Sequence, residues 1–136
     1  MSPTDIVRSS MPLCATLGVT ASDFAADRVV LHLDWRPDLC TGGEVLHGGV
    51  LMALADSAGA ACAFLNLPDG AAGTITIEPK TNFLGAARQG ASIAASATPL
   101  HRGRTTMVIE TELRNADGAL IAKTTQTQAV LRASTS

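Results

Sequence analysis

One long apolar segment, residues 48–67, constrains the fold of this chain more than any other feature. It is long enough to cross a bilayer. However, Asp56 lies near its middle, where a charge is costly in lipid, and no aromatic or basic residues anchor its ends. We therefore expect a buried helix of a soluble protein, from about residue 47 to residue 65, ended by Pro68-Asp69-Gly70.

The rest of the chain is dominated by alternating apolar and polar residues, the pattern of strands. A short amphipathic helix over residues 4–10 is expected to begin with Thr4 as its N-cap. Pro79 predicts a bulge or a sheet edge, because proline cannot donate to a strand ladder. The predicted strands are residues 17–25 and 28–35 before the helix, and residues 74–84, 90–100, 105–113 and 120–131 after it.

This order of elements predicts an α+β fold. A curved antiparallel sheet of about six strands would wrap round the one long helix, which is apolar on nearly every side. We expect one domain over residues 1–136, with residues 1–14 as an N-terminal helical segment. One sheet covers only part of such a helix, so a second copy is expected to cover the rest.

The net charge and the cysteine content limit which partners and which cellular compartment we expect. The net charge is −2 and the basic residues are scattered, so no nucleic-acid partner is expected. The three cysteines, Cys14, Cys40 and Cys62, are too far apart in sequence for a disulfide framework or a close-spaced zinc site. We expect a cytoplasmic protein that carries no metal, does not bind membranes and has no signal peptide.

Asp56 is the residue most open to a chemical role. An ionised carboxylate in an apolar helix must be paired, protonated or exposed to a wet cleft. It is either a structural residue at a helix contact or a reactive group. Gly48 and Gly49 begin the helix and expose backbone N–H groups, which suit a developing oxyanion. Eight residues of helix separate Gly48 from Asp56 by about 12 Å, so both reach one carbonyl only if Asp56 comes from a neighbouring subunit.

The run "LHGGVLMALADSAGA" resembles the core motif of hotdog-fold acyl-CoA thioesterases, in particular the phenylacetate-degradation (PaaI-like) group. The resemblance extends to "TITIEPKTNFLGAA", "LHRGRTTMVIETEL" and "DGALIAKTTQTQAVL". It implies a hotdog fold, an acyl-CoA substrate and a homodimer, often doubled to a tetramer, with active sites at the subunit interface. CoA is part of that substrate, and no separate cofactor is implied.

The resemblance also implies roles for single residues. The N–H of Gly48 would polarise the thioester carbonyl, with Gly49 beside it, and Asp56 of the partner subunit would activate water or attack directly. His47 would shape the loop, and Thr76 falls where related enzymes have a hydroxyl that helps to hold the water. Thr41 stands where the family usually has Asn, a departure that favours altered acyl specificity.

Substrate contacts away from the thioester are less constrained. Arg102 and Arg104 are the first candidates for the CoA phosphates, followed by Arg88 and Lys80. Small residues near Asp56 leave room for an aryl or medium-chain acyl group. The alternatives are a non-catalytic acyl-CoA binder or sensor, a hydratase of the same fold whose own motif we do not find, and a structural domain.

Overall fold

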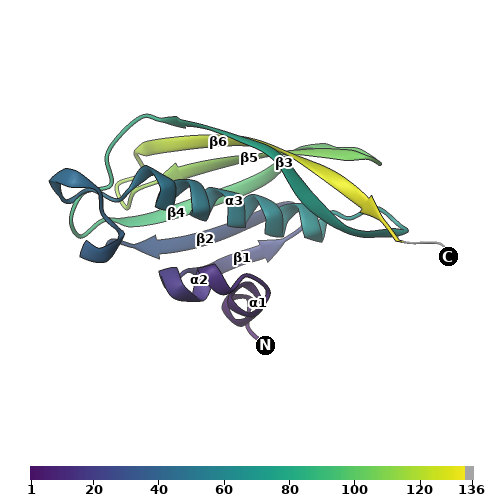
Figure 1. The fold of residues 1–136 in the computed structure, drawn as a ribbon, viewed down its shortest axis with the longest axis horizontal. Coiled ribbons are helices and arrows are strands. Elements are labelled where there is room, and N and C mark those ends of the chain that lie inside the picture. The colour runs from purple at the N-terminus through teal and green to yellow at the C-terminus, as the bar shows by residue number, and fades with distance from the viewer. Residues whose placement is uncertain (134–136) are drawn as a thin grey trace.

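The computed structural model describes residues 1–133, in which six antiparallel strands form one curved sheet around a long helix (Figure 1). The sheet order is β1-β2-β4-β5-β6-β3, so β1 and β3 are its two edges. The predicted α+β architecture is confirmed. The strands are β1 (Thr20–Ala25), β2 (Arg28–Asp34), β3 (Ala71–Phe83), β4 (Ser92–Arg102), β5 (Thr106–Arg114) and β6 (Leu120–Arg132).

Helix α3 (Gly48–Leu65) forms the centre of the core. Its sheet-facing side chains, among them Leu51, Leu54 and Cys62, are buried against the concave face of the sheet. The helix is long and apolar enough to span a membrane by length and composition, yet it is the core helix of this fold. The sheet leaves one side of α3 uncovered: Phe64 near its end remains 60% exposed.

The N-terminal segment differs from its prediction in two places. Helix α1 (Pro3–Ser10) is capped by Ser2, not Thr4: the Ser2 hydroxyl accepts from the Asp5 N–H, and the Asp5 carboxylate accepts from the Ser2 N–H. This reciprocal pair satisfies two N–H groups at once, which Thr4 cannot do. The Thr4 hydroxyl instead accepts from the N–H of Ala21 and so joins α1 to β1.

A second short helix, α2 (Pro12–Leu17), occupies the chain where a strand was expected to begin at residue 17. Pro12 favours the first turn of a helix, and Gly18 ends it in the left-handed conformation at φ 75°. The helical segment therefore extends to Leu17 and not to residue 14, and the first strand begins at Thr20. The last residues of the predicted domain, 134–136, lie outside the described part of the chain.

The other elements agree with the sequence to within three residues at each end. Residues 37–44, predicted as a loop, contain two short 3-10 turns, η1 (Pro37–Leu39) and η2 (Gly42–Glu44). Pro79 lies on the edge strand β3, next to a shift in register between Thr76 and Glu78. Both expectations for Pro79, an edge and a bulge, are therefore confirmed.

Candidate active site

The carboxylate of Asp56 projects from the middle of α3 and is half-buried. Two side chains donate hydrogen bonds to the same oxygen, Oδ1. The Thr76 hydroxyl on β3 lies at 3.2 Å, and Nε2 of Gln126 on β6 lies at 3.0 Å. Oδ2 accepts no hydrogen bond from the described residues. One oxygen is thus fixed while the other is free to accept a proton or approach an electrophile.

A second buried glutamine supports this arrangement. Nε2 of Gln128 donates to the Thr76 hydroxyl at 2.7 Å, so the hydroxyl must direct its own proton towards Asp56. Gln126 and Gln128 are 0% and 1% exposed. Buried hydrogen bonds to a charged group are the stronger kind. The chain from Gln128 through Thr76 therefore sets the orientation of the carboxylate.

Glycine at position 59 makes room for this network. A Cβ there would overlap Oε1 of Gln126, so the side-chain amide lies directly against the helix backbone. Oε1 is buried and has no hydrogen-bond partner among the described residues. An unsatisfied buried carbonyl costs stability. Gln126 thus occupies a position that packing alone would not favour.

Neither glutamine was identified from the sequence, although a signal was present. In "LIAKTTQTQAVL", Lys123 must point away from the core of a half-buried strand, and the alternating residues Thr124, Gln126 and Gln128 must then point inward. All three are buried. Polar side chains on the inward face of a central strand need partners, and this requirement indicated a site.

The N-terminus of α3 is shaped by His47, Gly48 and Gly49. His47 caps the helix: its Nδ1 accepts from the Gly49 N–H at 2.8 Å, and its own N–H donates to the carbonyl of Leu39 at 2.9 Å. The Gly49 amide is thus already engaged. The Gly48 N–H makes no hydrogen bond within the described chain. It remains free to donate at the positive end of the helix dipole.

Phe83 explains why the first helical residue is glycine. A Cβ on Gly48 would lie 3.2 Å from the Phe83 ring, tighter than ordinary contact. The ring therefore packs directly on the helix start and is itself 49% exposed. An apolar group beside a free N–H excludes competing water and strengthens the pull of that N–H on a bound oxygen.

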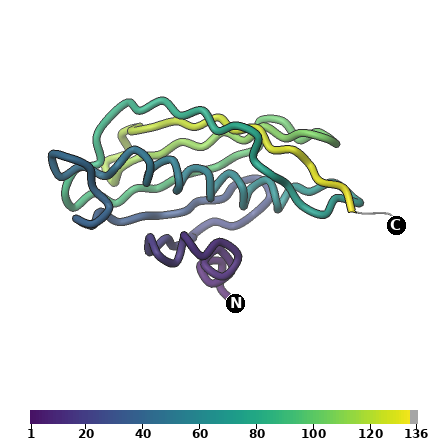
Figure 2. Tube along the Cα trace, viewed as in Figure 1, coloured from purple at the N-terminus to yellow at the C-terminus, as the bar shows by residue number. Residues whose placement is uncertain are grey.

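The remaining predicted residues fall at opposite ends of α3. Thr41 and Arg88 are exposed near its N-terminal end, where Leu46 donates to the Ala87 carbonyl, and the Thr41 side chain makes no hydrogen bond within residues 1–133. Arg102 donates to Asn66 Oδ1 at 3.2 Å, at the C-terminal end of the helix, and the exposed Arg104 lies in the adjoining turn. In Figure 2 α3 runs from the left of the view to right of its centre, so its two ends are well separated.

The two buried cysteines do not offer a nucleophile. Burial raises the pKa of Cys14 and outweighs the opposing effects of Ser57 and Arg8. Burial likewise raises the pKa of Cys62 to about 11. Both thiols are therefore protonated at neutral pH and unreactive. Asp56 is therefore the candidate reactive group near the middle of α3.

Comparison with known proteins gives a consistent result. The Thioesterase superfamily model matches residues 43–122. A predicted esterase of Saccharolobus solfataricus is 30% identical over 128 residues, which cover 94% of this chain and 89% of that protein. Among solved structures, S. sahachiroi AziG is 31% identical with a TM-score of 0.84, covering 90% of this chain and 98% of that one.

Two further structures extend the comparison. Thioesterase HI1161 of Haemophilus influenzae is 25% identical with a TM-score of 0.86, covering 97% of this chain and 92% of that one. The E. coli PaaI protein, from the phenylacetic acid degradation operon, is 20% identical with a TM-score of 0.84, covering 93% of this chain and 89% of that one. At this identity PaaI shows the shared hotdog fold only.

Proposed function

Since the chain belongs to the thioesterase superfamily and is a thioester hydrolase, we propose that it hydrolyses the thioester of an aryl- or medium-chain acyl-CoA to free acid and CoA. The observation that carries this proposal is the carboxylate of Asp56, with Oδ1 held by two donors and Oδ2 free. An apolar helix retains such a group at a cost in stability. A catalytic role accounts for that cost.

Two routes are compatible with this geometry. In the first, Asp56 takes a proton from water as the hydroxide adds to the thioester carbonyl, and the proton then goes to the departing CoA thiolate. In the second, Oδ2 attacks the carbonyl, CoA leaves, and water hydrolyses the resulting anhydride. In both, the N–H of Gly48 stabilises the negative charge on the carbonyl oxygen.

A homodimer is needed to complete this site. Gly48 and Asp56 are separated by about 12 Å along one helix, so a single chain cannot bring both to one carbonyl. The unpaired edge of β3, with Ile75 and Ile77 at 58% and 60% exposure, offers a surface for a second copy. Antiparallel packing of two α3 helices would bring Gly48 to Asp56 of the partner subunit. Two such dimers would form the tetramer suggested by the resemblance.

The same arrangement brings the predicted cations together. Arg88 lies near the N-terminal end of α3, and Arg102 and Arg104 lie at the other end. When two helices are antiparallel, opposite ends become neighbours. Arg88 of one subunit and Arg102 and Arg104 of its partner would then flank one mouth of the interface. We assign the CoA phosphates to that mouth, and we place the protein in the cytoplasm.

Release of free thiol from a panel of acyl-CoAs tests the proposal. Wild type should turn over at least one ester, and Asp56→Asn should lose about two orders of magnitude in kcat, as expected for a missing general base. Asp69→Asn, which changes an exposed acid after the same helix, is the control and should match wild type. Full activity in Asp56→Asn would refute the mechanism. Tight binding without turnover would favour a non-catalytic acyl-CoA binder.

A further inference from the structure

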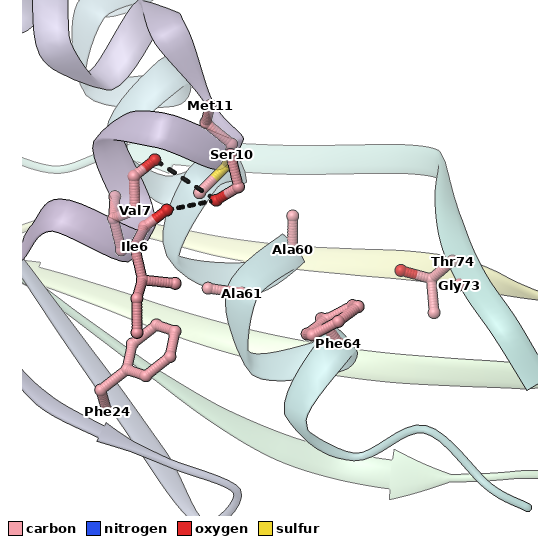
Figure 3. Close-up of a pocket in the computed structure, with 10 residues that line it drawn as sticks. All are labelled: Ile6, Val7, Ser10, Met11, Phe24, Ala60, Ala61, Phe64, Gly73 and Thr74. Carbon is pink, nitrogen blue, oxygen red and sulfur yellow. Dashed lines mark hydrogen bonds between the residues drawn. The ribbon is translucent and has the colours of Figure 1, made fainter. Parts of the chain in front are cut away.

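An apolar groove of about 510 Å³ opens beside the C-terminal half of α3 (Figure 3). Helix α1 forms one wall, and the start of β3 forms the other. The volume falls within the range of small-molecule sites. The residues that define the groove are Ile6, Met11, Phe24, Ala60, Phe64 and Thr74.

The groove lies next to the Asp56 site along two elements. On α3, Ala60 follows Asp56 by four residues, one helical turn, and so lies on the same face. On β3, Thr74 precedes Thr76 by two residues and so points to the same side of the sheet. Because Thr76 contacts Asp56, both elements lead from the carboxylate into the groove.

The lining is suited to hydrocarbon. It contains no charged side chain, and the Ser10 hydroxyl is already used because it donates to the carbonyl of Ile6 at 2.6 Å. Phe64 is 60% exposed and Ile6 is 37% exposed, although both border the groove. Large apolar surfaces of this kind around a cavity mark a binding site for apolar groups.

The distance along α3 from Asp56 to the far end of the groove distinguishes between acyl groups. From Asp56 through Ala60 to Phe64 is eight residues of helix, or about 12 Å. An extended hydrocarbon chain advances about 1.3 Å per carbon, given C–C bonds of about 1.5 Å, so about eight to ten carbons span that distance. A phenylacetyl group is little more than half as long and would leave the Phe64 end empty.

We propose that this groove binds the acyl chain of the substrate and selects a saturated, uncharged chain of about eight to ten carbons. This inference rests on the proposed function and adds the substrate class. The thioester lies at Asp56, the first carbons pass Ala60 and Thr74, and the chain ends between Ile6 and Phe64. Helix α1 is thereby part of the substrate site.

Chain-length profiles test the groove. For wild type, kcat/KM should rise about fourfold per methylene from butanoyl- to octanoyl- or decanoyl-CoA and then level off, as expected for buried CH₂ groups. Phenylacetyl-CoA should be a poorer substrate than octanoyl-CoA. A flat profile, or a preference for phenylacetyl-CoA, would overturn the inference even if hydrolysis depends on Asp56.

Variants locate the chain within the groove. Ala60→Leu fills the passage and should lower decanoyl-CoA turnover at least about tenfold more than butanoyl-CoA turnover. Phe64→Ala should move the optimum to longer chains. Leu13→Ala removes an exposed side chain from the neighbouring helix outside the groove and should keep the wild-type profile. If the groove variants change only the oligomeric state, a second copy occupies the groove and the inference is wrong.

Binding separates this inference from the proposed function. Calorimetry with Asp56→Asn, which should hydrolyse the ester about a hundredfold more slowly, measures affinity before much of the ester is turned over. Affinity should rise with chain length to about ten carbons, and the double variant Asp56→Asn, Ala60→Leu should lose that rise. If wild type hydrolyses no ester and this binding pattern holds, the groove assignment stands and the hydrolase proposal fails. If hydrolysis occurs and affinity is independent of chain length, the groove assignment fails alone.

Discussion

Replacing Gln126 by Met separates the orientation of the catalytic carboxylate from the stability of the fold. Met is close to Gln in length and lacks its polar atoms, so the contact with Gly59 keeps a side chain of similar shape. The variant removes the donor 3.0 Å from Asp56 Oδ1. It also removes Oε1, a buried acceptor that has no partner among the described residues.

The two effects on stability oppose each other. Loss of a hydrogen bond to a charged group costs about 1.5–3 kcal/mol, whereas removal of an unsatisfied buried acceptor recovers about 1–3 kcal/mol. When the middle of each range is taken, the free energy of unfolding should change by less than about 1 kcal/mol. Activity has no such compensation. Asp56 keeps only Thr76 as a donor, and a displacement of about 1 Å in a reacting group can cost about a hundredfold.

Urea unfolding and steady-state thiol release measure the two effects on the same sample. We expect an unchanged midpoint, kcat lowered about tenfold to a hundredfold, and KM nearly constant. Gln128→Met, one hydrogen bond further from Asp56, should have a smaller effect, and the exposed Gln89→Met should have none. Wild-type kcat in Gln126→Met would refute the positioning role, and a large loss of stability would refute the balance of the two terms.

Three further predictions address the ends of α3. Gly48→Ala brings a methyl group within 3.2 Å of the Phe83 ring and crowds the free N–H. Thiol release should therefore fall at least about tenfold with little change in melting temperature. Undiminished activity would remove Gly48 from the site. Asn66→Ala removes the side-chain amide that donates to the carbonyls of Ala26 at 2.6 Å and Cys62 at 2.7 Å. The free energy of unfolding, measured in urea, should fall by about 2 kcal/mol. An unchanged midpoint would contradict this. Arg102→Ala with Arg104→Ala should raise KM for the CoA ester more than it lowers kcat, and an unaltered KM would place the phosphates elsewhere.

Most of the fold was predictable because the hydrophobic patterns that indicate its helix and strands are long. The lone apolar helix and the period-two runs of β3 to β6 each extend over many residues, so local errors average out. The N-terminal segment gives no such signal. Helix α2 has only six residues, and its identity depends on Pro12 at the start and Gly18 at the end. Ser2 and Thr4 lie close together, and both carry a hydroxyl that can cap a helix. Ser2 is the cap because it exchanges two hydrogen bonds with Asp5, and the sequence did not reveal that contact.

Site residues were predictable only where their side chains differ in polarity from the residues around them in the sequence. Asp56 is conspicuous because it is a charge within an apolar helix, and the structure joins it to Thr76, which the family resemblance indicated. The inward direction of Gln126 and Gln128 follows from their alternation with Lys123 along β6. Their partners do not, because only the packing of β6 with β3 and α3 brings these side chains to Asp56 and Thr76. The groove beneath α1 likewise depends on where a separate helix docks, which no local pattern specifies.

The central claim is that each active site combines Gly48 of one subunit with Asp56 of its partner, and mixing two inactive variants tests it most directly. Gly48→Val and Asp56→Asn would be refolded together, so that half of the dimers are mixed and each mixed dimer has one site with both residues intact. The mixture should recover about one quarter of wild-type thiol release per subunit. No recovery above the two variants alone, with mixed dimers present, would contradict the shared site.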